Sequence, residues 1–233
     1  ELLENKTFSL DENFDIKLYK SHFYDSALII KIDNVDILNL NDCPLNTESE
    51  LKSFFKKYGS FDILLTQFSY AAWKGGKNNK NWREDAAQEK ISAIIKQCEI
   101  LKIKKLLPFA SYIYFSNMLN FYLNDSINTP TKISNALLNR NTEVIALKPL
   151  EKQYLNNLKQ NYDSEYFWQE AYSKINSLPR IKYEESFSLD SLNESLKIYK
   201  KRIFTKNSKL LIYTLSKIWF LKIFSELNIF LVD

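Results

Sequence analysis

The residues most suited to chemistry lie in the segment LNLNDCPLN, residues 38–46, where a carboxylate and a thiol follow an apolar run. Asp42 comes one position after the strand-like sequence VDILNLN. Because side chains alternate along a strand, Asp42 shares a face with Leu38 and Leu40. A carboxylate at the mouth of a sheet needs a cation, a metal or several N–H donors. Asp42 is therefore either a functional residue, as a metal ligand or a catalytic group, or a cap of the turn made with Pro44.

Two further candidates precede this segment in KSHFYDSAL. His22 is the only histidine, so the chain cannot build a multi-histidine zinc site by itself, and this residue is either structural or part of a pocket. Asp25 is either a turn residue or a second pocket carboxylate. A single histidine also argues against a Ser-His-Asp triad. The sequence contains no GxGxxG or GxxxxGK[ST] phosphate loop, which sets aside Rossmann and P-loop interpretations.

Two segments rich in polar and aromatic side chains each follow a predicted strand. They are QFSYAAWKGG, residues 67–76, and PFASYIYFSNMLNFYLNDSINTP, residues 108–130. Loops after successive strands commonly form the sites of α/β proteins, although surface loops with some core aromatics would have the same composition. The substrate-binding candidates are Gln67, Ser69, Trp73, Tyr112, Asn124, Asp125 and Asn128.

The elements that would position these residues follow a recognisable order. Strands are expected at residues 14–20, 27–32 and 35–41, with a hairpin turn at Asp33-Asn34 and a helix at residues 48–58. The pattern then alternates between strands at residues 61–65, 104–110 and 143–149 and helices at residues 83–101 and 128–141. This order predicts an α/β fold with a mixed sheet and helices packed on its outer side.

After Pro149 the sequence pattern changes from alternating strands and helices to helix-like segments. We expect an α/β domain at residues 1–150 and a mostly helical region at residues 151–233. Within the second region the helix-like segments lie near residues 163–175 and 189–227, and a last strand-like segment covers residues 228–233. The chain is long enough to bury a sizeable core in one large domain or in a domain with an appendage.

The composition is that of an ordinary globular protein, with 45% hydrophobic and 26% charged residues. A net charge of +4 is too small to indicate a nucleic-acid partner without a local basic patch. The segment KIYKKRIFTKNSK, residues 197–209, either meets phosphate groups of nucleic acid or lipid or is a solvated helix face, and the second is the ordinary reading.

The cysteines and the apolar segments indicate which cellular compartment to expect for the protein. Cys43 and Cys98 form neither a disulfide framework nor a zinc pattern, so both thiols are expected to be free in a reducing cytoplasm. The first residues show no basic region followed by an apolar one, so no signal peptide is expected. The most apolar stretch, residues 210–224, carries two lysines and falls short of the roughly 18 apolar residues of a membrane span.

Three segments together resemble the metallo-β-lactamase-fold family that includes CMP-N-acetylneuraminate hydroxylase. The first is DSALIIKIDNVDILNLNDC, the second is DILLTQFSYAAWKGG before a long helix, and the third joins KKLLPFASYIYFS, FYLND and EVIALKP. Their order and spacing are similar over about residues 11–149. This sequence does not contain the HxHxDH metal motif of that family. In the family, the motif lies before the part that corresponds to Glu1 of this sequence.

The resemblance implies a four-layer αββα fold with a metal site at the edge of the sheets, and Asp42 would match a metal-ligand aspartate. The metal would be divalent iron or zinc, or absent from this part of the protein, and would support hydrolysis or hydroxylation of a polar small molecule such as a sugar nucleotide or another phosphorylated compound. The rest of the domain would come from the same or another polypeptide. The alternative is a non-catalytic binding domain that keeps the fold without metal.

Overall fold

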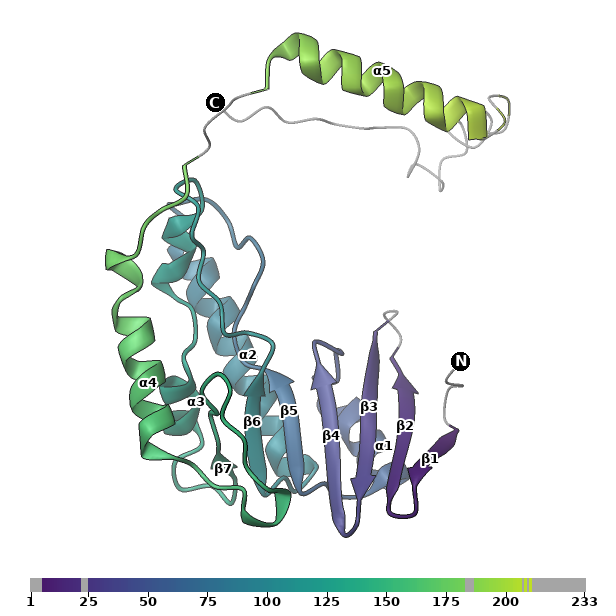
Figure 1. Ribbon diagram of the computed structural model, residues 1–233, viewed down its shortest axis with the longest axis vertical. Coiled ribbons are helices and arrows are strands. Elements are labelled where there is room, and N and C mark those ends of the chain that lie inside the picture. Colours follow the sequence, from purple (N-terminus) through teal and green to yellow (C-terminus); the bar gives the residue numbers. More distant parts are fainter. Residues whose placement is uncertain (1–5, 22–24, 183–186, 207, 209, 211–233) are drawn as a thin grey trace. The chain divides into compact units, whose positions relative to one another are not determined.

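The computed structural model describes residues 6–21, 25–182, 187–206, 208 and 210, and its contacts divide the chain into two compact units (Figure 1). The first unit is Glu1–Lys182 and the second is Tyr183–Asp233. The predicted division at residue 150 does not coincide with this boundary. The reason is that residues after 150 pack on the sheet, since Leu158 is buried in an apolar cluster with Ile37 and Ile63.

The first unit is built on a seven-stranded mixed sheet, which confirms the α/β fold class. The strands follow the chain order: β1 (Thr7–Asp11), β2 (Phe14–Lys20), β3 (Ser26–Ile32), β4 (Val35–Asn41), β5 (Ile63–Gln67), β6 (Lys105–Phe109) and β7 (Glu143–Val144). The pairs from β1 to β4 are antiparallel, and those from β4 to β7 are parallel. The carboxyl ends of β4, β5 and β6 therefore meet at one edge of the sheet.

Three strands differ from the sequence-based expectation. β1 was not predicted, and β7 contains two residues where seven were expected. The sequence predicts that the proline at position 108 ends the strand KKLLPFA, but Pro108 lies within β6 and pairs with Thr66 of β5. Proline lacks the N–H that a central strand donates, but β7 pairs only with Lys105 and Leu106, so no β7 hydrogen bond is lost at this position.

The helices lie close to the predicted positions. They are α1 (Glu48–Tyr58), α2 (Lys80–Ile100), α3 (Pro130–Ala136), α4 (Tyr162–Ser173) and α5 (Leu189–Lys206), with short 3₁₀ turns η1 (Phe121–Asp125), η2 (Leu155–Asn157) and η3 (Ile175–Ser177). A capping box between Thr47 and Glu50 starts α1, and Pro130 occupies the first turn of α3. The part of the predicted helix at residues 189–227 that follows Leu210, and the predicted last strand, lie outside the residues that the structure describes.

One face of the sheet packs on the helices. Leu38, Leu40, Leu64 and Leu106 from β4, β5 and β6 form the main core with side chains of α1, α2 and the α3 region. The helix residues of this cluster include Leu51, Phe54, Ile94, Cys98 and Ile133. All of these side chains are buried, so this face is covered in the way that the alternating sequence predicts.

The opposite face is also apolar. The strand registers align Ile16, Ile30, Ile37 and Ile63 in one row across β2, β3, β4 and β5. A second row joins Leu18 and Leu28, and a third joins Phe14, Ile32 and Val35. Paired residues point to the same side of a sheet, so these rows form one continuous apolar surface, which we call the open face.

Among the described residues of the first unit, the open face is covered over β4, β5, β6 and β7. There Leu155 and Leu158 pack against Ile37, Ile63 and Ile145. In Figure 1, α1 lies behind the strands and the segment after β7 passes in front of them, so the two lie on opposite faces of the sheet. Within residues 6–21 and 25–182, the open-face side chains of β2 and β3 stay only half-buried.

The segment that covers this part of the sheet is held by Glu151. Its carboxylate accepts hydrogen bonds from the Lys148 backbone N–H at 3.1 Å, from Gln153 Nε2 at 2.7 Å, from Asn161 Nδ2 at 3.3 Å and from the Ser164 hydroxyl. Burial alone would raise the pKa of Glu151, but these hydrogen bonds outweigh it and lower the pKa to about 2. One carboxylate thus joins the loop after β7 to the first turn of α4.

The two faces predict different costs for truncation. Leu38→Ala empties a filled position between the sheet and the helices, and it should lower the free energy of unfolding by about 2–5 kcal/mol. Leu28→Ala removes the same atoms from the half-buried open face, and it should cost less than about 2 kcal/mol. Urea unfolding of both variants measures the difference. Equal losses would contradict the assignment of the covered and open faces.

Candidate functional site

The candidate site lies at the edge of the sheet where the parallel strands β4 and β5 end. Asn41, the last residue of β4, has a φ of 49°, which turns the chain out of the sheet. Asp42 follows it and is exposed, and its Oδ1 accepts a hydrogen bond of 2.7 Å from Asn41 Nδ2. Gln67 is the last residue of β5, at the same edge. Two of the predicted site residues, Asp42 and Gln67, therefore end adjacent strands.

A lysine that the sequence did not single out contacts Gln67 and lies within electrostatic reach of Asp42. Lys90 of α2 donates a hydrogen bond from Nζ to Gln67 Oε1. Burial lowers the pKa of Lys90, the charge of Lys74 lowers it further, and the negative charge of Asp42 opposes this shift. Among the described ion pairs none includes Lys90. The edge therefore combines a carboxylate, an amide and a half-buried ammonium group.

Cys43 lies beside this edge, and the charges of two carboxylates affect the pKa of its thiol. Burial raises the pKa of its thiol, a hydrogen bond with Ser21 opposes the shift, and the charges of Asp25 and Asp42 raise it further. Asp25 thus lies within electrostatic reach of the same thiol as Asp42. Both Cys43 and Cys98 are buried free thiols, as the sequence predicted. His22 lies outside the described residues.

Asp125 forms an ion pair with the buried guanidinium of Arg83, while its own carboxylate is partly exposed. Its two carboxylate oxygens accept hydrogen bonds from Arg83 Nε at 2.8 Å and Arg83 Nη2 at 2.6 Å. The Arg83 side chain is 1% exposed, and this pairing holds the pKa of Asp125 below its ordinary value although burial would raise it. Arg83 also donates to the carbonyl oxygens of Gly76 at 2.7 Å and Lys77 at 3.1 Å. The pair therefore anchors the loop between β5 and α2.

The same loop depends on Gly75, whose carbonyl accepts a hydrogen bond of 3.0 Å from the Tyr122 hydroxyl. Gly75 has a φ of 77°, and a Cβ there would lie 2.6 Å from Asn79 Cβ and 2.8 Å from Trp82 Cε3. Only glycine fits this position. Trp73 lies in the same loop, is 62% exposed, and meets Trp82 edge to face at 5.4 Å.

Three other predicted residues make internal hydrogen bonds. Asn128 is 1% exposed, and its amide donates to the carbonyls of Phe68 at 3.0 Å and Ala87 at 2.8 Å. The Asn128 backbone N–H donates to the Ser69 hydroxyl at 2.9 Å. Asn124 bonds to both the N–H and the carbonyl of Phe115 at 2.8 Å. Asn128 thus links the segments that follow β5 and β6, and Asn124 fixes the segment after β6 on itself.

Tyr112 packs between aromatic rings. Its ring stacks on Trp168 of α4 with centroids 4.0 Å apart and meets Phe68 edge to face at 4.9 Å. Burial raises the pKa of its phenol, and the buried hydroxyl has no hydrogen-bond partner among the described residues. The structure thus places Asp42 and Gln67 together at the edge and places Tyr112 among aromatic rings.

Comparisons with known proteins give a distant likeness to solved structures. No protein-family model matches the chain, and no curated protein matches it. Among solved structures, the chain is similar to a mutant of the beta-hydroxylase CmlA, with 10% identity and a TM-score of 0.38. The match covers 62% of this chain and 32% of that protein, so the chain spans about a third of its length. A TM-score below 0.5 supports no inference about function.

No helix among the described residues has both the length and the apolar character that crossing a bilayer requires. The apolar stretch at residues 211–224 lies outside this part of the chain. The exposed apolar side chains of α5, such as Ile198 and Tyr199, alternate with lysines.

The ion pair of Arg83 and Asp125 gives a pH-dependent prediction. Asp125→Ala leaves the Arg83 guanidinium without its partner, and the free energy of unfolding should fall by about 3 kcal/mol at pH 7. The lowered pKa of Asp125 stabilises the fold above its unfolded value of about 4, and this contribution is lost as the pH falls through the folded value. The difference between wild type and variant should therefore shrink below pH of about 4.

Urea unfolding at several pH values measures this effect. Glu170→Ala is the matched control because it removes a carboxylate from an exposed pair with Lys174 and should cost no more than about 0.5 kcal/mol. A loss at Asp125→Ala as small as the control's would show that this pair does not anchor the loop.

Proposed function

We propose that this chain forms one part of a composite metal-dependent enzyme. The proposal rests on one observation: an exposed carboxylate, Asp42, stands at the carboxyl edge of a sheet that is apolar on both faces. An apolar sheet face needs a cover, and a second sheet packed on it would form the inner layers of an αββα sandwich. The edge that carries Asp42 would then border both sheets.

The described residues do not fit a metal ion by themselves. Within residues 6–21, 25–182 and the described part of the second unit, no three side chains of His, Cys, Asp and Glu cluster closely enough to hold one. Asp42 would supply one oxygen ligand, and the proposal requires the remaining ligands from polypeptide outside the described residues. This polypeptide would belong to the same protein or to a partner chain, and it would also supply the second sheet.

The proposed reaction is hydrolysis or hydroxylation of a polar small molecule. Divalent iron or zinc is the cofactor that the family resemblance implies, and either supplies Lewis-acid or redox chemistry when bound. A sugar nucleotide or another phosphorylated compound is the proposed substrate class, on the analogy of that family. The buried free thiols Cys43 and Cys98 support a reducing, cytoplasmic setting.

A second candidate is a non-catalytic binding domain. The observation that favours it is α5, whose described residues include the exposed bases Lys197, Lys200, Lys201, Arg202 and Lys206. An exposed basic helix can contact an acidic partner without any metal.

Metal analysis separates the two candidates. The longest native polypeptide, purified with any partner that accompanies it, should contain stoichiometric iron, zinc or manganese by mass spectrometry. Asp42→Ala should lose this metal because one ligand is removed. Asp163→Ala, which changes an exposed aspartate of α4, should keep it. A metal-free native protein, or full retention of metal by Asp42→Ala, would refute the enzyme and leave the binding domain.

A further inference from the structure

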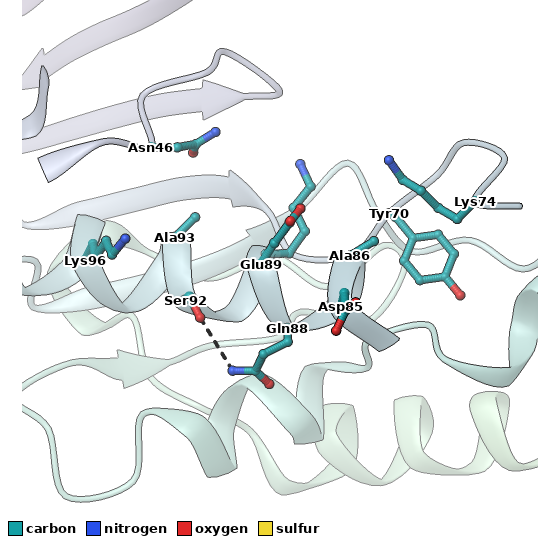
Figure 2. A pocket seen from close by; sticks show the side chains of 11 residues that line it. Asn46, Tyr70, Lys74, Asp85, Ala86, Gln88, Glu89, Ser92, Ala93 and Lys96 are labelled. Atoms are coloured by element: carbon teal, nitrogen blue, oxygen red, sulfur yellow. Dashed lines mark hydrogen bonds between the residues drawn. The ribbon is translucent and has the colours of Figure 1, made fainter. Parts of the chain in front are cut away.

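A cavity of about 680 Å³ lies beside α2, next to the candidate site. Figure 2 shows side chains of α2, including Asp85, Glu89, Ser92 and Lys96, along one wall. Tyr70 and Lys74 from the loop after β5 lie at one end of the row, and Asn46 from the loop after β4 lies toward the other (Figure 2). The volume is within the range of about 300–1,000 Å³ typical of small-molecule sites.

Three lysines line this cavity, and none of them takes part in an ion pair of the described residues. Lys96 is exposed, whereas Lys74 and Lys90 are partly buried. The charge of Lys74 lowers the pKa of Lys90, so Lys74 lies within electrostatic reach of Lys90. Two such ammonium groups on one cavity without a counter-ion attract an anion.

The carboxylates of the cavity do not neutralise these lysines directly. Glu89 acts on Lys90 through its charge and forms no ion pair with it among the described residues. Asp85 and Glu89 are both exposed to solvent, where screening weakens their effect. Asp42 also acts on Lys90 from outside the cavity lining. A ligand therefore meets both signs of charge, and Lys74 and Lys90 are the partly buried cationic contacts for its anionic group.

Uncharged groups add hydrogen-bonding capacity. Asn46 Oδ1 accepts a hydrogen bond of 3.2 Å from Gln97 Nε2, which fixes the amide group. The Tyr70 hydroxyl donates to the Leu123 carbonyl at 2.6 Å, so Tyr70 contributes its ring to the cavity instead of its hydroxyl. The lining thus combines charged donors, an oriented amide and an aromatic surface.

We propose that this cavity binds the phosphate group of a phosphorylated small molecule, with Lys74 and Lys90 as the cationic contacts. Lysine ammonium groups bind phosphate as point charges, and the volume leaves room for an organic group beside the phosphate. The inference deepens the proposed function, on which it rests, because it places the charged end of the substrate next to Lys90 and within electrostatic reach of Asp42.

Calorimetry of the full chain with pyrophosphate tests this site. Lys74→Gln and Lys90→Gln remove the charge and keep most of the side-chain length. Each should weaken pyrophosphate binding about tenfold or more, because a charge-assisted hydrogen bond is lost. Lys90→Arg keeps the charge and should retain binding. Lys77→Gln is the matched control because it removes an exposed lysine from the same loop outside the cavity lining.

The control variant should bind pyrophosphate within about twofold of wild type, since an exposed charge is screened. Absence of binding by wild type at millimolar pyrophosphate would overturn the proposal. Equal weakening by Lys74→Gln, Lys90→Gln and Lys77→Gln would also overturn it, because binding would then depend only on net charge. Thermal melting of each variant checks that a loss of binding does not come from unfolding.

The outcome is separable from that of the metal experiment. Pyrophosphate titrations use metal-free protein, in which Asp42→Ala should bind as tightly as wild type or more tightly because a nearby negative charge is removed. Metal binding that depends on Asp42, combined with pyrophosphate binding that ignores Lys90, would refute this inference alone. The reverse result would refute the metal-dependent enzyme and keep the phosphate site.

Discussion

The structure depends on one constraint, which is that the sheet is apolar on both faces. The helices cover one face, where Tyr19 of β2 meets Phe54 of α1 at 4.9 Å. Further along β2 the helix side is polar, with Asp15 bonded to Ser9 at 2.6 Å, while Phe14 and Ile16 lie on the open face. An antiparallel sheet with one solvated side would place its apolar residues toward the helices only. The strands β2 and β3 instead carry apolar side chains on both faces, so a cover on the open face completes their burial.

The same constraint explains where chemistry can occur. Parallel strands of this sheet end at one edge, and polar residues there would lie between the sheet and whatever covers it. Asp42 and Gln67 occupy this position, and α2 brings Lys90 to them. Arg83 and Asp125 act at a distance from this edge, because they hold the loop that carries Lys74. Arg83 and Asp125 thus position the loop, whereas other residues are the proposed contacts of metal and ligand.

Strand and helix patterns made most of the fold predictable. Alternation located β2 and β4 at their observed residues, and Pro130 marked the first turn of α3. The two-residue β7 was not foreseen because EVIALKP alternates like a longer strand, whereas its later residues pack against the segment that ends at Leu158. Local pattern does not reveal which strands lie at the edge of a sheet.

The candidate site was harder to predict. Asn128 and Asp125 have the polarity of ligand-binding residues, but the structure uses Asn128 to join loops and Asp125 to neutralise Arg83. Lys90 has the sequence context of a surface lysine on an amphipathic helix, and only the fold shows that it reaches Gln67. Residue type indicates what a side chain can do, while its partners depend on contacts between distant segments.

The central claim, that a second sheet covers the open face, is tested most directly by solvent access to Ile16. A single cysteine introduced as Ile16→Cys, with the native thiols buried, can be labelled by a maleimide in the complete native protein and in this chain alone. The account predicts slow labelling in the complete protein and faster labelling in this chain. Equally fast labelling in both would contradict it.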